Sequence, residues 1–113
     1  MKYEITTTTD FDKALKTLCK KYHSLVDDFE DFKKELIKNP YIGDDLGGNV
    51  RKIRLAIKSK TKGKSGGARV ISYNLVVDIE NTNVVLLAIY DKNVQDSISK
   101  REINQLKKGL GLI

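Results

Sequence analysis

Eight basic side chains and no acidic one lie between residues 46 and 77 of this 113-residue chain. They are Arg51, Lys52, Arg54, Lys58, Lys60, Lys62, Lys64 and Arg69. The flanking segments are not basic: residues 1–45 carry eight basic and ten acidic side chains, and residues 78–113 carry five of each. Because cations concentrated in one segment attract a polyanion, this segment predicts a surface that binds the phosphates of a nucleic acid.

Part of this basic segment is expected on strands, which present side chains more rigidly than a loop does. In residues 50–58 an apolar face alternates with a basic one, Ile53, Leu55 and Ile57 against Lys52, Arg54 and Lys58. Residues 59–66 are expected to form a basic loop, and Arg69 follows small residues that would let a phosphate approach the backbone. A solvated hairpin would also be basic, but it would normally include some of the 15 acidic residues found elsewhere.

Other kinds of site find little support in the sequence. The segment 63–66 lacks the first glycine of a phosphate-binding P-loop, because Lys58 stands in its place and a strand follows. Cys19 is the only cysteine and His23 the only histidine, and both are interpreted as structural. We therefore expect no metal site and no cofactor.

The elements that must position the basic segment can be predicted from hydrophobic spacing. Residues 2–8 alternate and predict a strand. Apolar residues at helical spacing predict helices over about 10–21, capped by Thr9 or Asp10, and from Ser24 to Asn39. The loop 40–49 is expected to be irregular, and strands are predicted at about 67–78 and 84–91. Ser99 and Glu102 form a capping box that opens a last helix.

This order of elements predicts a single α+β domain over residues 1–113. Short connections make the last three strands an antiparallel meander, and the helical hairpin must bury its apolar stripe on one face of that sheet. The other face is left to present Lys52 and Arg54. The chain has no apolar run long enough to span a bilayer and no secretory signal at its start, which predicts a cytoplasmic protein without a membrane partner.

Four stretches together resemble a known family. They are Lys-Ile-Arg-Leu-Ala at 52–56, Gly-Lys-Ser-Gly-Gly-Ala-Arg-Val-Ile at 63–71, Ile-Tyr-Asp-Lys at 89–92 and Ile-Ser-Lys-Arg-Glu-Ile at 98–103. The chain is similar to the RelE/ParE-superfamily toxins of bacterial type II toxin–antitoxin systems, closest to their HigB-like branch. The resemblance implies a RelE-like fold, which is a small twisted antiparallel β-sheet with an N-terminal helical hairpin on one face and a C-terminal helix.

The resemblance also implies an activity. Such a toxin is a ribosome-dependent endoribonuclease that cuts mRNA in the decoding site and blocks translation. A cognate antitoxin, expected to be a helix-turn-helix protein, covers its basic groove. The family's basic site positions correspond here to Lys52, Arg54, Arg69 and Lys92. Several members also use a C-terminal tyrosine, but this chain has none after Tyr90, which leaves the general base open.

The implied reaction is metal-independent attack of the RNA 2′-hydroxyl on the adjacent phosphorus. Lys52 or Lys58 would act as the base, because neighbouring cations favour a neutral lysine. Arg54 and Arg69 would hold the phosphate, and Lys92 would assist the leaving group or position the strand. The remaining candidates would bind RNA, either along its backbone or by stacking on bases: Lys60, Lys62, Lys64, Tyr73 and Tyr90.

Two other functions remain open from the sequence. A ParE-like protein of the same superfamily would inhibit DNA gyrase and cleave nothing, and fold alone cannot separate that outcome from a nuclease. A non-catalytic nucleic-acid-binding module would show binding that weakens steeply with salt, and no cleavage. The dense cationic positions between 52 and 69 favour the nuclease.

Overall fold

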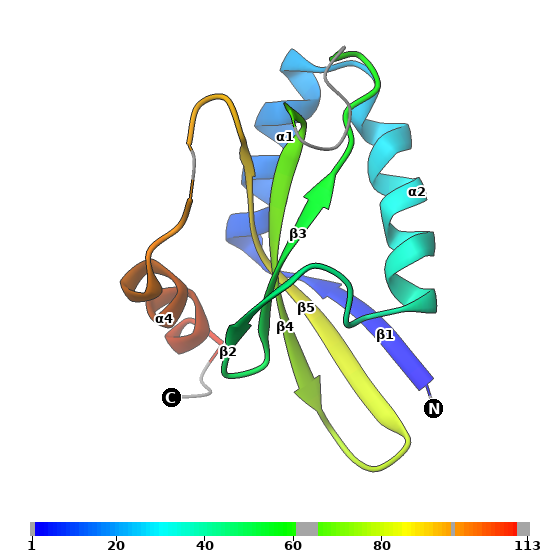
Figure 1. The fold of residues 1–113 in the computed structure, drawn as a ribbon, viewed down its shortest axis with the longest axis vertical. Coiled ribbons are helices and arrows are strands. Elements are labelled where there is room, and N and C mark those ends of the chain that lie inside the picture. Colours follow the sequence, from blue (N-terminus) through cyan, green and yellow to red (C-terminus); the bar gives the residue numbers. More distant parts are fainter. Residues whose placement is uncertain (1, 61–65, 96, 111–113) are drawn as a thin grey trace.

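Across residues 2–60, 66–95 and 97–110, which the computed structural model describes, the chain forms a five-stranded sheet in the order β1-β5-β4-β3-β2 (Figure 1). The strands are β1 (Lys2–Thr7), β2 (Asp44–Gly47), β3 (Val50–Leu55), β4 (Ala68–Val76) and β5 (Asn81–Asp91). Strands β2 to β5 are antiparallel, whereas β1 pairs with β5 in parallel. The α+β class is confirmed, but the expected sheet was wholly antiparallel, whereas the predicted first strand, β1, pairs in parallel.

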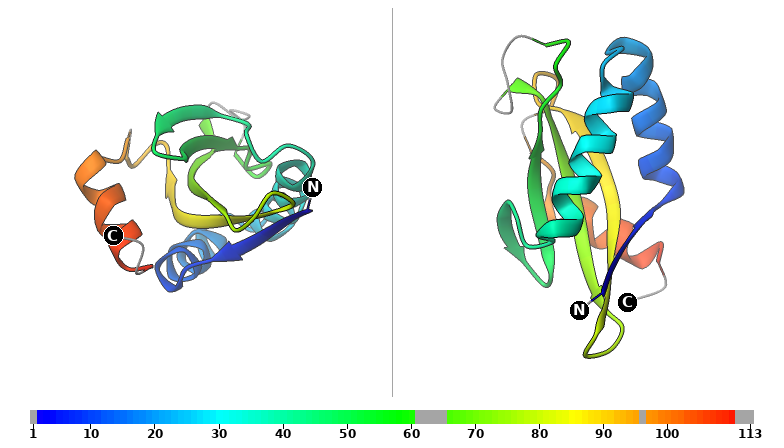
Figure 2. Two further views of the ribbon diagram at one scale, coloured as in Figure 1. Left: turned by 90° about the horizontal axis from the view of Figure 1, so that it is seen from below. Right: turned by 90° about the vertical axis from the view of Figure 1, so that its right-hand side faces the viewer.

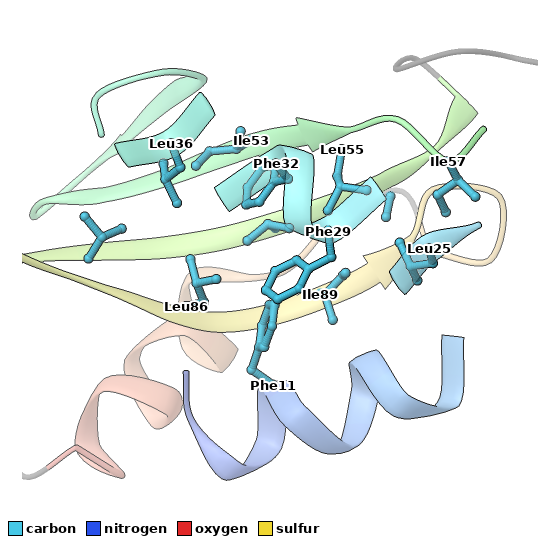
Figure 3. Packing of buried hydrophobic residues seen from close by; sticks show 13 residues of the cluster. Phe11, Leu25, Phe29, Phe32, Leu36, Ile53, Leu55, Ile57, Leu86 and Ile89 are labelled. Carbon is cyan, nitrogen blue, oxygen red and sulfur yellow. The ribbon is translucent and has the colours of Figure 1, made fainter. Parts of the chain in front are cut away.

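One face of the sheet is covered by the helices α1 (Thr9–Lys21) and α2 (Leu25–Lys38), as Figure 2 shows. Their apolar stripes meet the inward side chains of the sheet in the main core, where Phe11 packs against Phe29 and Phe29 against Phe32 (Figure 3). The expected hairpin is therefore confirmed. The cap of α1 was predicted wrongly: Thr8, and not Thr9 or Asp10, accepts the hydrogen bond from Phe11 N at 3.1 Å.

The opposite face is partly covered by α4 (Lys100–Lys108), which lies against it in Figure 2. Ser99 accepts a hydrogen bond from Glu102 N at 3.1 Å, which confirms the predicted cap. Ile103 of α4 packs in a second apolar cluster that includes Ile71, Leu87 and Tyr90. This face therefore has an apolar part under α4 and leaves the ends of β3 and β4 for the basic residues.

The structure differs from the prediction both before β3 and at its end. The loop 40–49 is not wholly irregular, because β2 pairs with β3 through a turn in which Gly47, Gly48 and Asn49 have positive φ. Strand β3 ends at Leu55 and not at residue 58. The backbone N–H of Lys58 instead donates to Asp28 Oδ2 at 2.9 Å, which draws the chain out of the sheet toward α2. None of the helices in the described ranges has the length and apolar character needed to cross a bilayer.

Candidate functional site

Arg54 and Arg69 stand directly opposite each other on β3 and β4, and Tyr90 stands opposite Arg69 on β5. Side chains of directly paired residues lie on the same face, with Cβ atoms about 4.5–5.5 Å apart. Ile53 and Leu55, the neighbours of Arg54, point into the core beneath α1 and α2. The three residues therefore form a row across the opposite face of the sheet, the face that α4 covers only in part.

Arg69 is held in an unfavourable electrostatic setting. Its side chain is 5% exposed, and Nη1 donates to the Ala68 carbonyl at 3.1 Å. Burial and then the charge of Arg54 lower the pKa of Arg69, while Tyr90 and Asp44 act in the opposite direction. Like charges directly opposite each other destabilise a sheet. A phosphate bound between the two guanidinium groups would relieve that repulsion, because arginine suits phosphate geometry.

The adjacent row adds Lys52, which pairs with Asp44 of β2 on one side and Ile71 of β4 on the other. Lys52 therefore shares the face of Arg54 and Arg69, as the sequence predicted. Asp44 lies on that face too, and its charge acts on Arg69. The sequence interpretation placed Asp44 in an irregular loop and missed it, although the Gly-Gly-Asn turn between Asp44 and Lys52 is typical of a hairpin.

Gly67 has a different role from the one proposed for the small residues before Arg69. A Cβ atom at Gly67 would clash with the carbonyl oxygen of Leu55. The glycine is therefore needed so that the backbones of β3 and β4 can approach each other at the basic end of the sheet. It helps to position Arg69 opposite Arg54, while the approach of a phosphate to this backbone stays a prediction.

Lys58 and Lys60 point away from this row. The Nζ atom of Lys58 lies 3.3 Å from Asp31 Oδ2 on α2, and both side chains are exposed. The Nζ atom of Lys60 donates to Asp91 Oδ1 at 2.8 Å and lies 5.0 Å from the ring centroid of Tyr22. Both lysines thus contact groups on the side of the sheet where α1 and α2 pack. Lys58 nevertheless lines a small hollow beside α2 together with Arg54.

Asp91, at the end of β5, is buried and connects several segments by hydrogen bonds. The sequence interpretation did not identify it. Its carboxylate accepts hydrogen bonds from the Tyr22 hydroxyl, from Lys60 Nζ and from Asn93 N. Burial raises the pKa of Asp91, but these hydrogen bonds and the charge of Lys60 outweigh it and lower the pKa to about 2. No short-range pattern could reveal this cluster, because Tyr22, Lys60 and Asp91 are far apart in the sequence.

The low pKa of Asp91 predicts a loss of stability in acid. The folded-state pKa of about 2 lies below the ordinary value of 3.8, so the stabilisation is complete above about pH 4 and disappears as the pH falls through 2. The difference corresponds to about 2 kcal/mol of unfolding free energy. Urea unfolding between pH 5 and pH 2 should show this loss in the wild type and not in Asp91→Asn. Equal acid sensitivity of the two proteins would contradict the assignment.

The other candidates are distributed as follows. The backbone N–H of Lys92 donates to the Gly67 carbonyl at 3.1 Å, so Lys92 lies at the same end of the sheet as Arg69. Tyr73 is four residues farther along β4, about 13 Å from Arg69, and Lys107 Nζ lies 4.9 Å from its ring centroid. Lys62 and Lys64 lie outside the described residues. Within the described part of the chain, no three acidic, histidine or cysteine side chains come together as a metal site would require.

Two comparisons with known proteins bear on the identity of the chain. Over residues 4–111 the sequence matches the family described as the RelE toxin of the RelE/RelB toxin–antitoxin system. A solved structure of a mutant E. coli toxin RelE in the free state is similar, with a TM-score of 0.55 and 15% sequence identity, over 85% of this chain and 90% of that one. This likeness shows that the two chains share a fold. Because the family match spans nearly the whole chain, the protein belongs to the RelE toxin family.

Proposed function

We propose that this chain is the toxin of a toxin–antitoxin pair and acts as an endoribonuclease on mRNA in the ribosomal decoding site. The observation that carries the proposal is the direct pairing of Arg54 and Arg69 on the face of the sheet that α4 covers only in part. A cognate antitoxin would silence the toxin by covering this face. The Lys-Ser-Gly-Gly-Ala-Arg and Ile-Tyr-Asp-Lys motifs support placing it in the HigB-like branch of the family.

The reaction needs three catalytic contributions from the protein. A base removes the proton of the 2′-hydroxyl, cations stabilise the extra charge on the phosphoryl oxygens, and an acid protonates the departing 5′-oxygen. Arg54 and Arg69 stabilise the charge on the phosphoryl oxygens. Lys52 is the lysine candidate for the base, because it shares their face of the sheet. Lys92 remains a candidate to assist the leaving group.

The positions of the two lysines predict different effects of removing them. Lys52→Ala should slow cleavage by about 100-fold or more, the usual contribution of a general base. Lys58→Ala should slow it much less, because Lys58 contacts Asp31 on the α2 side. Single-turnover cleavage of a message on programmed ribosomes measures both rates. A larger loss for Lys58→Ala than for Lys52→Ala would reverse the assignment.

The proposed function itself is tested by adding purified protein to ribosomes programmed with a defined message. Cleavage that requires the ribosome supports the proposal. Inhibition of DNA gyrase with an intact message would establish the ParE-like alternative instead. Salt-sensitive RNA binding without any cleavage would establish a non-catalytic module. Both of these outcomes would overturn the nuclease assignment.

A further inference from the structure

The hydroxyl group of Tyr90 has no hydrogen-bond partner among the residues that the structure describes, although the residue is only 8% exposed. A buried hydroxyl without a partner costs stability, and such groups in native proteins call for an explanation. Phenylalanine would fill the same space without that cost. The hydroxyl therefore does not contribute to the stability of the fold.

The position of Tyr90 connects this hydroxyl with the basic row. Tyr90 is the direct cross-strand partner of Arg69, which is in turn the partner of Arg54. The ring packs in the apolar cluster with Ile71 and Leu87, so the side chain is fixed and its faces are not free to stack on a base. This differs from the role predicted from the sequence, in which Tyr90 stacks on RNA.

There is room for a substrate group next to the tyrosine. Tyr90 borders a hollow of about 370 Å³ that lies among α1, β5 and α4, and its polar lining comes from Asp10, Gln95, Glu102 and Gln105. The hydroxyl itself has almost no contact with solvent in the ligand-free protein. Substrate must therefore shift the neighbouring side chains before it can meet the hydroxyl. Arg69 has a long side chain that a phosphate would attract, and catalytic hydrogen bonds often form only once the substrate is bound.

We propose that Tyr90 is the general acid of the cleavage reaction and gives its hydroxyl proton to the departing 5′-oxygen. The inference rests on the proposed nuclease function and deepens it. In the step, the 2′-oxygen loses its proton to the base and bonds to phosphorus, and the bond from phosphorus to the 5′-oxygen breaks. The 5′-oxygen takes the proton of Tyr90, and the products are a 2′,3′-cyclic phosphate and a 5′-hydroxyl. The phenolate, next to the charge of Arg69, regains a proton from water.

The electrostatics of the free protein suit this role. Burial raises the pKa of Tyr90, and the charge of Arg69 opposes that shift. The hydroxyl therefore carries its proton at neutral pH, as an acid must before the reaction. An alkoxide leaving group is far more basic than a phenolate, so the transfer is downhill even from a tyrosine with a raised pKa.

Tyr90→Phe removes one oxygen atom and tests the proposal with two readouts. Cleavage on programmed ribosomes should fall by about 100-fold, the usual contribution of a general acid. The melting temperature should stay the same or rise, because the variant no longer buries an unpaired hydroxyl. Tyr41→Phe, at an exposed tyrosine outside the site, is the matched control and should change neither quantity. Cleavage by Tyr90→Phe at the wild-type rate would overturn the proposal.

A second substrate separates proton transfer from a positioning effect. In a message whose scissile 5′-oxygen is replaced by sulfur, the leaving group is a thiolate, which needs little protonation because a thiol pKa lies near 8.5. Tyr90→Phe should then cleave almost as fast as the wild type, whereas Lys52→Ala should stay slow because its base is still missing. A Tyr90→Phe defect that persists on the sulfur substrate would overturn the acid role. If the wild type cleaves neither message, the nuclease function fails as a whole, which is a different result from the loss of Tyr90 alone.

Discussion

Arg69→Ala is expected to end growth arrest when the protein is expressed in bacteria, and to lower the cleavage rate by about 100- to 1,000-fold. The arginine is nearly buried opposite Arg54, and the charge of that neighbour repels it. Removing it takes away one of the two paired guanidinium groups proposed to hold the phosphate. Because Arg69 is 5% exposed and donates a hydrogen bond to Ala68 O, the melting temperature of the variant is measured beside its activity.

Two further variants make this expectation specific. Arg69→Lys keeps the charge but loses the planar fork that binds two phosphate oxygens, so its rate should fall between those of the wild type and Arg69→Ala. Arg101→Ala removes an exposed arginine on α4 and should leave growth arrest intact. Growth of cells after induction and the rate on programmed ribosomes are the measurements. Toxicity of Arg69→Ala equal to that of the wild type would remove Arg69 from the site.

Asp91→Asn is expected to lower the free energy of unfolding by about 3–5 kcal/mol, the usual result of removing one partner of a buried ion pair. The Lys60 ammonium bound to Asp91 is itself only 9% exposed, so the substitution leaves a buried charge without its counter-charge. This loss exceeds the roughly 2 kcal/mol derived from the pKa of Asp91. Protonation and the substitution both neutralise residue 91, but the amide also places an NH2 group, which cannot accept a hydrogen bond, where a carboxylate oxygen accepted one.

The control for this variant is a surface pair of the same chemical type. Asp31→Asn breaks the exposed contact with Lys58 and should cost less than about 1 kcal/mol. Adding Lys60→Met to Asp91→Asn should recover most of the lost stability, because the stranded charge is then gone. Urea titration measures all four proteins. If Asp91→Asn is no less stable than Asp31→Asn, the buried cluster does not anchor this end of the fold.

The Asp91 cluster affects the site because it connects segments next to the strands that carry the site residues. Asp91 ends β5, the strand that carries Tyr90, and Lys60 lies in the segment that leaves β3 (Figure 1). The Tyr22 contact adds the end of α1 to the same cluster. The strands that carry Arg54 and Tyr90 are therefore held in place by interactions on the helix side of the sheet. We expect the arginine face to tolerate its own repulsion because that cluster is satisfied.

Much of the architecture was predictable because its causes are local. Helical spacing identified the stripes of α1 and α2, a capping box located α4, and alternation placed Lys52 and Arg54 on the face opposite Ile53. Each of these signals depends on residues a few positions apart, whose geometry is imposed by the periods of helix and strand. The concentration of cations in the middle of the chain was visible in the same way, since net charge needs no coordinates.

The composition of the site was decided by the tertiary structure. The pairing of Arg54 with Arg69 and of Arg69 with Tyr90 depends on strand register, and a shift of one residue would have put them on opposite faces. Lys58 fits the alternating pattern but leaves the sheet, because Asp28 of α2 binds its backbone. Lys60 looks like another free cation in the sequence, yet it is buried against Asp91. Charge and periodicity are properties of the chain, whereas register, burial and the choice of partner arise only when distant segments pack together.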